Sequence, residues 1–351
     1  MPQSLVVATY LPAARQTDGS RGIPSPFFQR PKKGMQMTDS YTPKPDMASV
    51  QALAATLRQQ RPGTVTLETL PQLRAAMLAS YKAREGVEER VIPGIDGHDV
   101  PVRIIRPSGP ATAVVVTNHS SGWVIGAALQ DDALNSILVE KLGVATVSVD
   151  YRLAPEHPFP AAATDIWSVG AWLDDAGEKE FGTANIIMGG HSAGAHLTAV
   201  WVIRARDERP DLLRRVNAVF LTYGAYDLGE APSVRLMKDD SLIITREQYD
   251  SFQAFAFPGL DLEAKRDPAI SPLYADLAGL PPALITVGSL DPLLDDSLFL
   301  AARWEAAGND TALDAWPGCV HGFVDRDPGT AALYTERLTS WLGARIHRER
   351  G

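Results

Sequence analysis

The sequence predicts an α/β protein built on a mostly parallel sheet of eight strands, with helices on both faces. Three observations lead to this prediction. Apolar runs typical of strands alternate with helical patterns from about residue 86 onward, a G-x-S-x-G motif stands between a predicted strand and a predicted helix, and the alternation is interrupted once, between about 229 and 275. Strands that alternate with helices imply parallel strands whose crossover helices cover both faces of the sheet.

The first 85 residues precede the predicted sheet and differ from it in character. Residues 1–36 are rich in Pro, Gly, Arg and Lys and lack periodicity, so we expect a disordered extension. Apolar residues at helical spacing follow Asp46, which is a suitable N-cap, and Pro62 and Gly63 end this helix. A second helix is expected over 70–81.

From residue 86 onward the pattern changes to strands and helices in turn. A hairpin is expected first, with its turn at Asp96–Gly97. The expected strands are 91–92, 100–104, 114–117, 144–149, 186–187, 219–223, 283–287 and 312–316. Helices are expected near 134–142, 166–173 and 298–304, directly after Ser192, and from about 331. The segment 229–275 contains aromatic residues without strand spacing, and we interpret it as an inserted helical cap.

Composition and charge exclude several classes of function. The net charge of −9 argues against nucleic acid as a partner, because phosphate binding needs a basic surface. No apolar run reaches the roughly 18 residues that a membrane span needs, and the apolar patch 5–10 lacks the basic residues of a signal peptide. The single cysteine, Cys319, cannot form an intramolecular disulfide, which suits a cytoplasmic protein. No cluster has the spacing of zinc ligands, so we expect neither metal nor cofactor.

The motif Gly190-His191-Ser192-Ala193-Gly194 marks Ser192 as the candidate nucleophile. It stands where a predicted strand turns into a predicted helix, which is the context that a nucleophile elbow requires. The turn is sharp, so small residues have to flank the serine. The serine hydroxyl is then exposed at the carboxyl edge of the sheet, beside the positive end of a helix.

A nucleophilic serine needs a base to accept its proton and a third group to orient that base. In α/β hydrolases the acid and then the histidine follow the serine along the chain. Among the histidines after Ser192, His196 lies on the same helix and His347 in a charged terminal segment. His321 follows the last predicted strand, in the loop where the base belongs, and is the candidate base.

Asp291 is the candidate acid. It comes directly after the predicted strand 283–287, and Pro292 then begins a helix. Asp295 and Asp296 lie inside that helix, and Asp314 lies within the last predicted strand rather than after it.

Several further motifs resemble those of the hormone-sensitive-lipase-like esterases, bacterial family IV of the α/β-hydrolase superfamily. They are DYRLAPEHPFP at 150–160, SPL at 271–273, LPPAL at 280–284, DPLLD at 291–295 and HGF at 321–323. The resemblance covers roughly residues 45–345. It implies an α/β-hydrolase domain formed by 86–228 and 276–351, a cap formed by 37–85 together with 229–275, and ester hydrolysis without a metal.

The oxyanion motif departs from that family. The family has His-Gly-Gly-Gly where this chain has His119-Ser120-Ser121-Gly122. By family position the backbone donors are Ser121, Gly122 and Ala193. A serine supplies the same N–H as a glycine, although its Cβ disfavours a positive φ. The sequence leaves open whether the added hydroxyls are incidental or donate to the oxyanion or the substrate.

Two other sets of residues near these motifs are interpreted as structural. His191 stands where the family has Asp, and we expect its side chain to face away from the reacting centre. Buried charges need partners. We therefore expect the following residues to pair and to hold the oxyanion loop and the elbow: His119, Asp150, Arg152 and Glu156.

These features favour a carboxylesterase that acts on small to medium acyl esters through an acyl-enzyme. An amide, carbamate or lactone hydrolase with the same triad is an alternative, and a ligand-binding receptor on a hydrolase scaffold is a remote one. The only partner predicted is a small-molecule ester, and a homodimer is left open. The residues expected to shape the substrate pocket are Ser120, Trp123, Tyr223, Phe252, Phe255 and Phe257.

Overall fold

A computed structural model describes residues 41–60, 63–238 and 241–346, so the extension expected over 1–36 lies outside the described residues. The strands form one eight-stranded sheet in the order β1-β2-β4-β3-β5-β6-β7-β8. Only β2 runs antiparallel to its neighbours, β1 and β4, and every later pairing is parallel. The strands are β1 (Glu88–Ile92), β2 (Val100–Ile105), β3 (Val114–Asn118), β4 (Ala145–Val149), β5 (Ile186–His191), β6 (Val216–Thr222), β7 (Ala283–Gly288) and β8 (Thr311–Trp316). The predicted fold class is confirmed.

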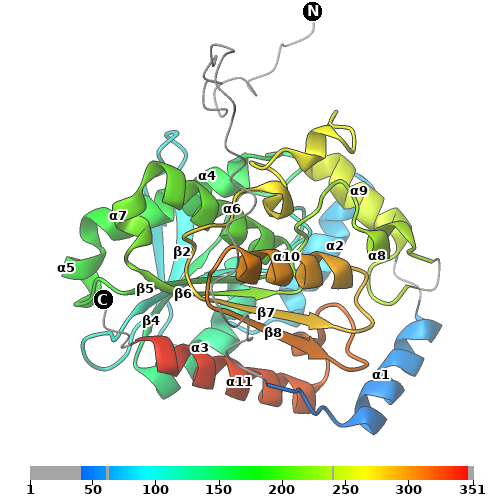
Figure 1. Ribbon diagram of the computed structural model, residues 1–351, viewed down its shortest axis with the longest axis horizontal. Coiled ribbons are helices and arrows are strands. Elements are labelled where there is room, and N and C mark those ends of the chain that lie inside the picture. The colour runs from blue at the N-terminus through cyan, green and yellow to red at the C-terminus, as the bar shows by residue number, and fades with distance from the viewer. Residues whose placement is uncertain (1–40, 61–62, 239–240, 347–351) are drawn as a thin grey trace, which may run out of the picture. The chain divides into compact units, whose positions relative to one another are not determined.

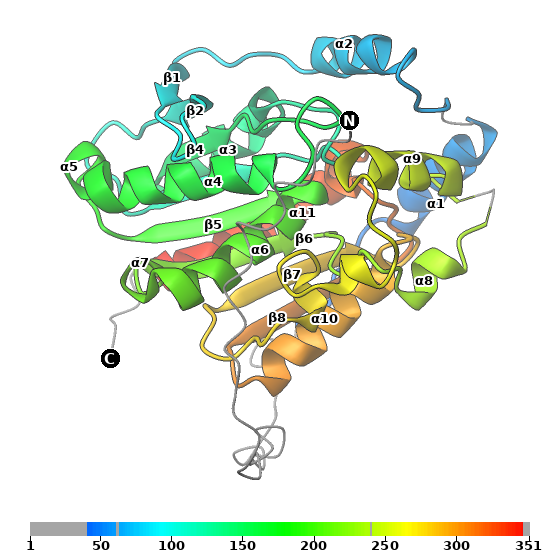
Figure 2. The ribbon, with the colours of Figure 1, turned by 90° about the horizontal axis from the view of Figure 1, so that it is seen from above.

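Helices cover both faces of this sheet (Figures 1 and 2). Helices α3 (Asp132–Leu142) and α11 (Pro328–Ile346) lie on one face. Helices α4 (Ala161–Trp172), α6 (Ala193–Glu208) and α10 (Leu294–Ala306) lie on the other. Successive residues of a strand point to opposite faces, so Val114 and Val116 pack in one apolar core while Val115 packs in the other. This two-sided burial explains why these strands are apolar throughout.

The described parts of the two segments predicted to form a cap lie beyond the carboxyl ends of the parallel strands (Figure 1). The first contains α1 (Met47–Gln59) and α2 (Leu70–Ser80), and the second contains α8 (Pro232–Arg235) and α9 (Arg246–Ala256). The side chain of Asp46 accepts a hydrogen bond from the N–H of Ala48, so it caps α1 as expected. The division into a cap and a catalytic domain stays a prediction.

Short elements that the sequence pattern did not predict connect the main ones. They are a π-helical turn at Leu173–Gly177, α5 (Glu178–Phe181), α7 (Pro210–Leu213) and 3₁₀ turns at Ala128–Asp131, Ala264–Arg266, Pro272–Tyr274 and Phe323–Asp325. Each is too short to show a helical period in the sequence.

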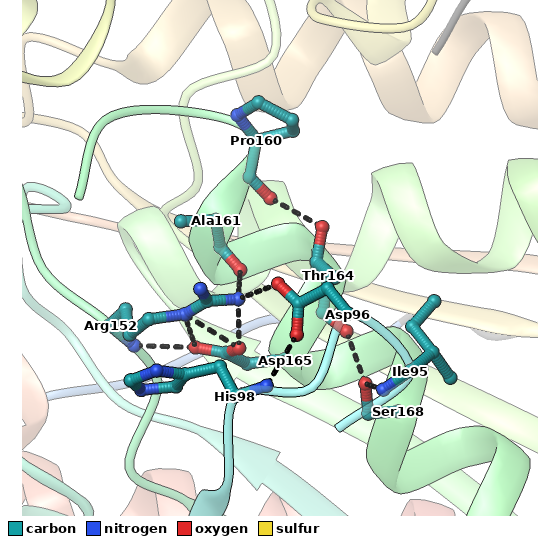
Figure 3. Close-up of polar contacts among 9 residues, drawn as sticks. All are labelled: Ile95, Asp96, His98, Arg152, Pro160, Ala161, Thr164, Asp165 and Ser168. Carbon is teal, nitrogen blue, oxygen red and sulfur yellow. Dashed lines mark hydrogen bonds and ion pairs between the residues drawn. The ribbon is translucent and has the colours of Figure 1, made fainter. Parts of the chain in front are cut away.

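Arg152, which follows β4, joins the first hairpin to helix α4 (Figure 3). Its guanidinium bonds both carboxylate oxygens of Asp165 in α4, with a shortest distance of 2.6 Å, and reaches Asp96 of the hairpin turn at 2.7 Å. Asp165 is buried, so the arginine supplies the partner that a buried charge requires. Beside them, Ser168 accepts a hydrogen bond from the N–H of Ile95. The antiparallel edge of the sheet is therefore tied to α4, a helix that packs against α6.

Candidate active site

Ser192 stands in a strained turn between β5 and α6. Its φ of 53° and ψ of −120° lie in a region that L-residues rarely adopt. Its N–H donates to the carbonyl of Thr222 in β6 at 2.8 Å, which holds the turn against the neighbouring strand. A Cβ at Gly194 would collide with the carbonyl oxygen of Asn118, which explains the glycine there. This strained turn places Ser192 at the carboxyl edge of the sheet.

His321 and Asp291 are brought to this serine from two other strand ends. The Nε2 atom of His321 lies 2.9 Å from Oγ of Ser192, and its Nδ1 atom lies 2.9 Å from Oδ2 of Asp291. A carboxylate can only accept, so Nδ1 carries the ring proton and Nε2 is left free to accept the serine proton. All three residues are buried, with 4–6% of their surface exposed.

The ring of Tyr223 packs against the ring of His321. Its ring centroid is 4.9 Å from that of His321, and the residue has no exposed surface. Tyr223 therefore contacts the candidate base, and a contact between Tyr223 and the substrate stays a prediction. Its packing limits the orientations that the imidazole of His321 can adopt.

The predicted oxyanion segment, residues 119–122, is held by hydrogen bonds that a glycine at position 121 could not make. The hydroxyl of Ser121 lies 2.7 Å from the hydroxyl of Tyr151 and accepts from the N–H of Trp123 at 2.8 Å. Tyr151 in turn donates to the carbonyl of His119. The Ser121 hydroxyl is thus engaged within the protein, so it is neither incidental nor placed as a donor to an oxyanion.

The other two predicted oxyanion donors have backbone N–H groups at positions suited to that role. Ala193 is the first residue of α6, where an N–H has no partner within the helix. Gly122 has a φ of 55°, and a Cβ there would lie 2.8 Å from Cδ2 of Phe252 in α9. Glycine is needed at this position because of both the backbone conformation and the ring beside it.

Trp123 and Phe257 form an apolar cluster rather than an open pocket wall. Both are buried, and their ring centroids lie 5.3 Å apart. The Nε1–H group of Trp123 donates to Nδ1 of His196, whose Nε2 lies 2.7 Å from the carbonyl of Ile270. Burial lowers the pKa of His196 to about 4, so this imidazole is neutral and donates from Nε2. Phe255 is only partly buried and packs at the edge of the same core.

Ser120, expected in the substrate pocket, and His191, expected to face away from the reacting centre, line a separate cavity. Its volume is about 170 Å³, and its walls include Asp131, Asp325 and Tyr334 but none of Ser192, His321 and Asp291. His191 is buried, and its Nε2 lies 3.2 Å from the hydroxyl of Tyr334. It therefore faces away from the serine, as its position in an elbow predicts. The assignment of Ser120 to the substrate pocket stays a prediction.

The four residues interpreted as scaffold each find a partner outside their own set. Asp150 accepts from the N–H of Ala128, and the ring of His119 stacks on that of Tyr151 with centroids 4.1 Å apart. Arg152 pairs with Asp165, and Glu156 pairs with Arg74 of α2 at 2.8 Å. These contacts are consistent with the expected structural role, and within the set the charge of Asp150 also acts on the ring of His119.

The described part of the chain has neither a candidate metal cluster nor a membrane-spanning helix. Within 41–60, 63–238 and 241–346 there is no group of three or more His, Cys, Asp or Glu side chains that could hold a metal ion. In the same residues no helix is long and apolar enough to cross a membrane.

Comparison with known proteins identifies the family of the chain. A family model described as the α/β-hydrolase fold matches residues 115–325, which is more than half of the chain. The carboxylesterase NlhH of Mycobacterium tuberculosis is 35% identical over 283 residues, covering 79% of this chain and 82% of that protein. The chain belongs to the hormone-sensitive-lipase-like serine carboxylesterases of the α/β-hydrolase superfamily.

Solved structures of esterases share its fold. An esterase of Pyrobaculum calidifontis superposes with a TM-score of 0.72 and 31% identity, covering 84% of this chain and 97% of that one. A hormone-sensitive lipase from a metagenome library gives a TM-score of 0.71 at 29% identity, covering 87% and 100%.

In this esterase, three residues have contacts at or next to the predicted oxyanion segment that the sequence alone does not indicate. Tyr151 lies within a recognised motif, but nothing in the sequence indicates that it bonds Ser121. Phe252 was one of several aromatic residues in the insertion, and only its position against Gly122 distinguishes it from the others. Arg74 lies on a predicted helix, and its partners are 50–82 residues away in sequence, so no local pattern could identify it.

Proposed function

We propose that this esterase hydrolyses small to medium acyl esters with Ser192 as nucleophile, His321 as general base and Asp291 as the acid that orients it. The observation that carries the proposal is the pair of 2.9 Å contacts that His321 makes, through Nε2 to Ser192 and through Nδ1 to Asp291. These distances suit direct proton transfer, and one tautomer of the histidine satisfies both contacts.

In the acylation step, Oγ of Ser192 attacks the ester carbonyl while Nε2 of His321 takes the hydroxyl proton. The carbonyl oxygen becomes an oxyanion that accepts hydrogen bonds from the N–H groups of Ser121, Gly122 and Ala193. The intermediate collapses, the bond to the alcohol oxygen breaks, and His321 returns the proton to the departing alcohol. Asp291 keeps the imidazolium in place throughout and stays ionised.

In the deacylation step, a water molecule takes the place of the alcohol. His321 accepts a proton from the water as its oxygen attacks the acyl carbon, and the same three N–H groups stabilise the second oxyanion. Collapse of this intermediate releases the carboxylic acid and returns the proton to Ser192. The cycle uses only groups of the chain, the ester and water.

The preference for small to medium acyl groups is supported by what surrounds the serine. Ser192 has 6% of its surface exposed, and the ring of Phe252 lies against Gly122 beside it. The buried cluster of Trp123 and Phe257 fills the neighbouring volume. We expect a long acyl chain to displace these rings and a short one to leave most of their packing intact.

The test combines active-site labelling with three variants. A fluorophosphonate should label Ser192 alone, as read by peptide mass spectrometry. Ser192→Ala, His321→Ala and Asp291→Asn should remain folded and lose about 10⁴-fold or more in turnover of a short aryl ester. Aryl esters of graded acyl length should give the highest kcat/KM at short to medium chains. Near-normal turnover by Ser192→Ala would falsify the proposal.

A further inference from the structure

Arg74 of α2 reaches into the main domain at the point where the oxyanion segment ends. Its Nε donates to the carbonyl of Val124 at 2.9 Å, and one terminal nitrogen donates to the carbonyl of Ala154 at 2.7 Å. Val124 lies two residues beyond Gly122 along the chain. The arginine therefore contacts the backbone next to the predicted oxyanion donors.

The two carbonyls belong to segments that are already paired with each other. The N–H of Ala154 donates to the carbonyl of Trp123 at 2.9 Å. Val124 and Ala154 have 0% and 1% of their surface exposed, so in the folded protein the guanidinium rather than water satisfies their carbonyls. An unpaired buried carbonyl is unfavourable, which favours the arrangement in which the guanidinium stays in place.

Glu156 holds the guanidinium in the required orientation. Its two carboxylate oxygens each lie 2.8 Å from a terminal nitrogen of Arg74. This two-point pairing fixes the plane of the guanidinium, which a lysine could not reproduce. Arg74 thereby joins α2, the oxyanion segment and the loop after β4 at one point.

We propose that Arg74 is a positioning residue for the oxyanion hole, so that α2 forms part of the catalytic apparatus as well as covering the site. The inference rests on the proposed function, because it assumes that Ser121 and Gly122 donate to the oxyanion. Arg74 does not touch the reacting atoms. It fixes the backbone that presents those N–H groups, and its loss lets that backbone shift away from the position that the oxyanion requires.

The chain offers a matched control in Arg215. Its Nε donates to the carbonyl of Ala184 at 3.0 Å, and a terminal nitrogen bonds both the carbonyl and the carboxylate of Asp174. It therefore makes the same kinds of contact as Arg74. It precedes β6, at the opposite end of the strand from Thr222 and Ser192. Removing it should cost comparable stability without moving the oxyanion segment.

The experiment compares Arg74→Ala, Arg74→Lys, Glu156→Gln and Arg215→Ala in the full chain. We expect Arg74→Ala to lower kcat between about 10-fold and 100-fold with little change in KM, since the loss of a complete oxyanion donor costs about 10²–10³-fold. Arg74→Lys, which keeps the charge but not the fork, should recover part of the rate. Glu156→Gln, which keeps the acceptor, should show a smaller loss of the same kind. Arg215→Ala should lower Tm while leaving kcat unchanged.

Inhibitor affinity separates positioning from a purely structural role. A trifluoromethyl ketone forms an adduct with the serine whose oxyanion uses the hole, whereas the corresponding secondary alcohol forms none. Arg74→Ala should weaken binding of the ketone in proportion to the loss of kcat/KM and leave binding of the alcohol unchanged.

The inference is overturned if Arg74→Ala loses stability as Arg215→Ala does but keeps normal kcat and ketone affinity. If Arg74→Ala fails to fold, Glu156→Gln decides by the same criterion. Ser192→Ala serves as a reference, because its activity tests the proposed function independently of Arg74.

Discussion

The ring of Phe252 and the backbone of Gly122 lie so close together that a Cβ on Gly122 would stand 2.8 Å from Cδ2 of the ring. This contact joins helix α9 of the inserted segment to the segment that carries the predicted oxyanion donors. Arg74 joins α2 to the same segment through the carbonyl of Val124. The two segments predicted to form the cap therefore each contact the oxyanion segment, one through an apolar ring and one through hydrogen bonds.

A methyl group at Gly122 should inactivate the enzyme. Gly122→Ala adds both the strain of a φ of 55° and a collision with Phe252, so the N–H of residue 122 is displaced. We expect kcat to fall by about 10²-fold or more. Gly308→Ala is the control, because its φ is 86° but no atom lies within 4 Å of the added Cβ. It should lower Tm slightly and leave kcat unchanged, and equal kinetic effects in the two variants would contradict the prediction.

Replacing Phe252 should change acyl-chain preference, whereas replacing Phe257 should chiefly change stability. Phe252 is partly buried beside Gly122, so Phe252→Ala should raise the ratio of long-chain to short-chain turnover across a panel of aryl esters. Phe257 is buried with Trp123, so Phe257→Ala should chiefly lower the free energy of unfolding, by about 3–5 kcal/mol. Denaturant unfolding and the ester panel measure the two effects. An unchanged acyl profile in Phe252→Ala would count against its role in the pocket.

The hydroxyl of Ser121 should matter to the stability of the oxyanion segment. Ser121→Gly restores the family residue but leaves the N–H of Trp123 without its acceptor, which costs about 1–3 kcal/mol. We expect a lower Tm and a loss in kcat below about 10²-fold, and Tyr151→Phe should have a weaker effect of the same kind. Ser168→Ala is the control, since that buried serine also accepts a backbone N–H, far from the oxyanion segment in sequence. A gain in Tm for Ser121→Gly would refute this interpretation of the hydroxyl.

Asp131 should make stability depend on pH around neutrality. Burial raises its pKa from 3.8 to about 7, so between these values the unfolded chain has released a proton that the folded protein still holds. The contribution of Asp131 to stability is therefore complete below pH 3.8 and is lost as pH rises through 7. Asp131→Asn cannot ionise and escapes this loss. The difference in Tm between the variant and the wild type should rise from pH 4 to pH 8, and a difference that is constant with pH would rule the prediction out.

Much of the fold and the order of the candidate catalytic residues could be predicted from the sequence, because both depend on local patterns. Apolar strands such as 114–118 and 283–288 are bounded by turn residues, and their burial on both faces leaves a continuous apolar run. Ser192, Asp291 and His321 each follow a strand, and parallel strands bring such residues to one edge of the sheet. The strand ends are therefore enough to nominate the three side chains, although not to measure their contacts.

The residues around them could not be assigned in this way, because their roles depend on contacts between distant parts of the chain. Tyr223 directly follows a strand, and tertiary packing puts its ring against that of His321 with no exposed surface. Ser120 and Ser121 are adjacent, but one lines a separate cavity and the other bonds Tyr151.

The sequence by itself determined the class of fold, the family and the three candidate catalytic residues, since strand alternation and short motifs are local properties of the chain. Only the tertiary structure decided what holds the oxyanion segment. Arg74 and Glu156 are 82 residues apart in sequence, and Gly122 and Phe252 come from different segments of the chain. The geometry of a backbone N–H depends on every group packed against it, and those groups become neighbours only when the chain has folded.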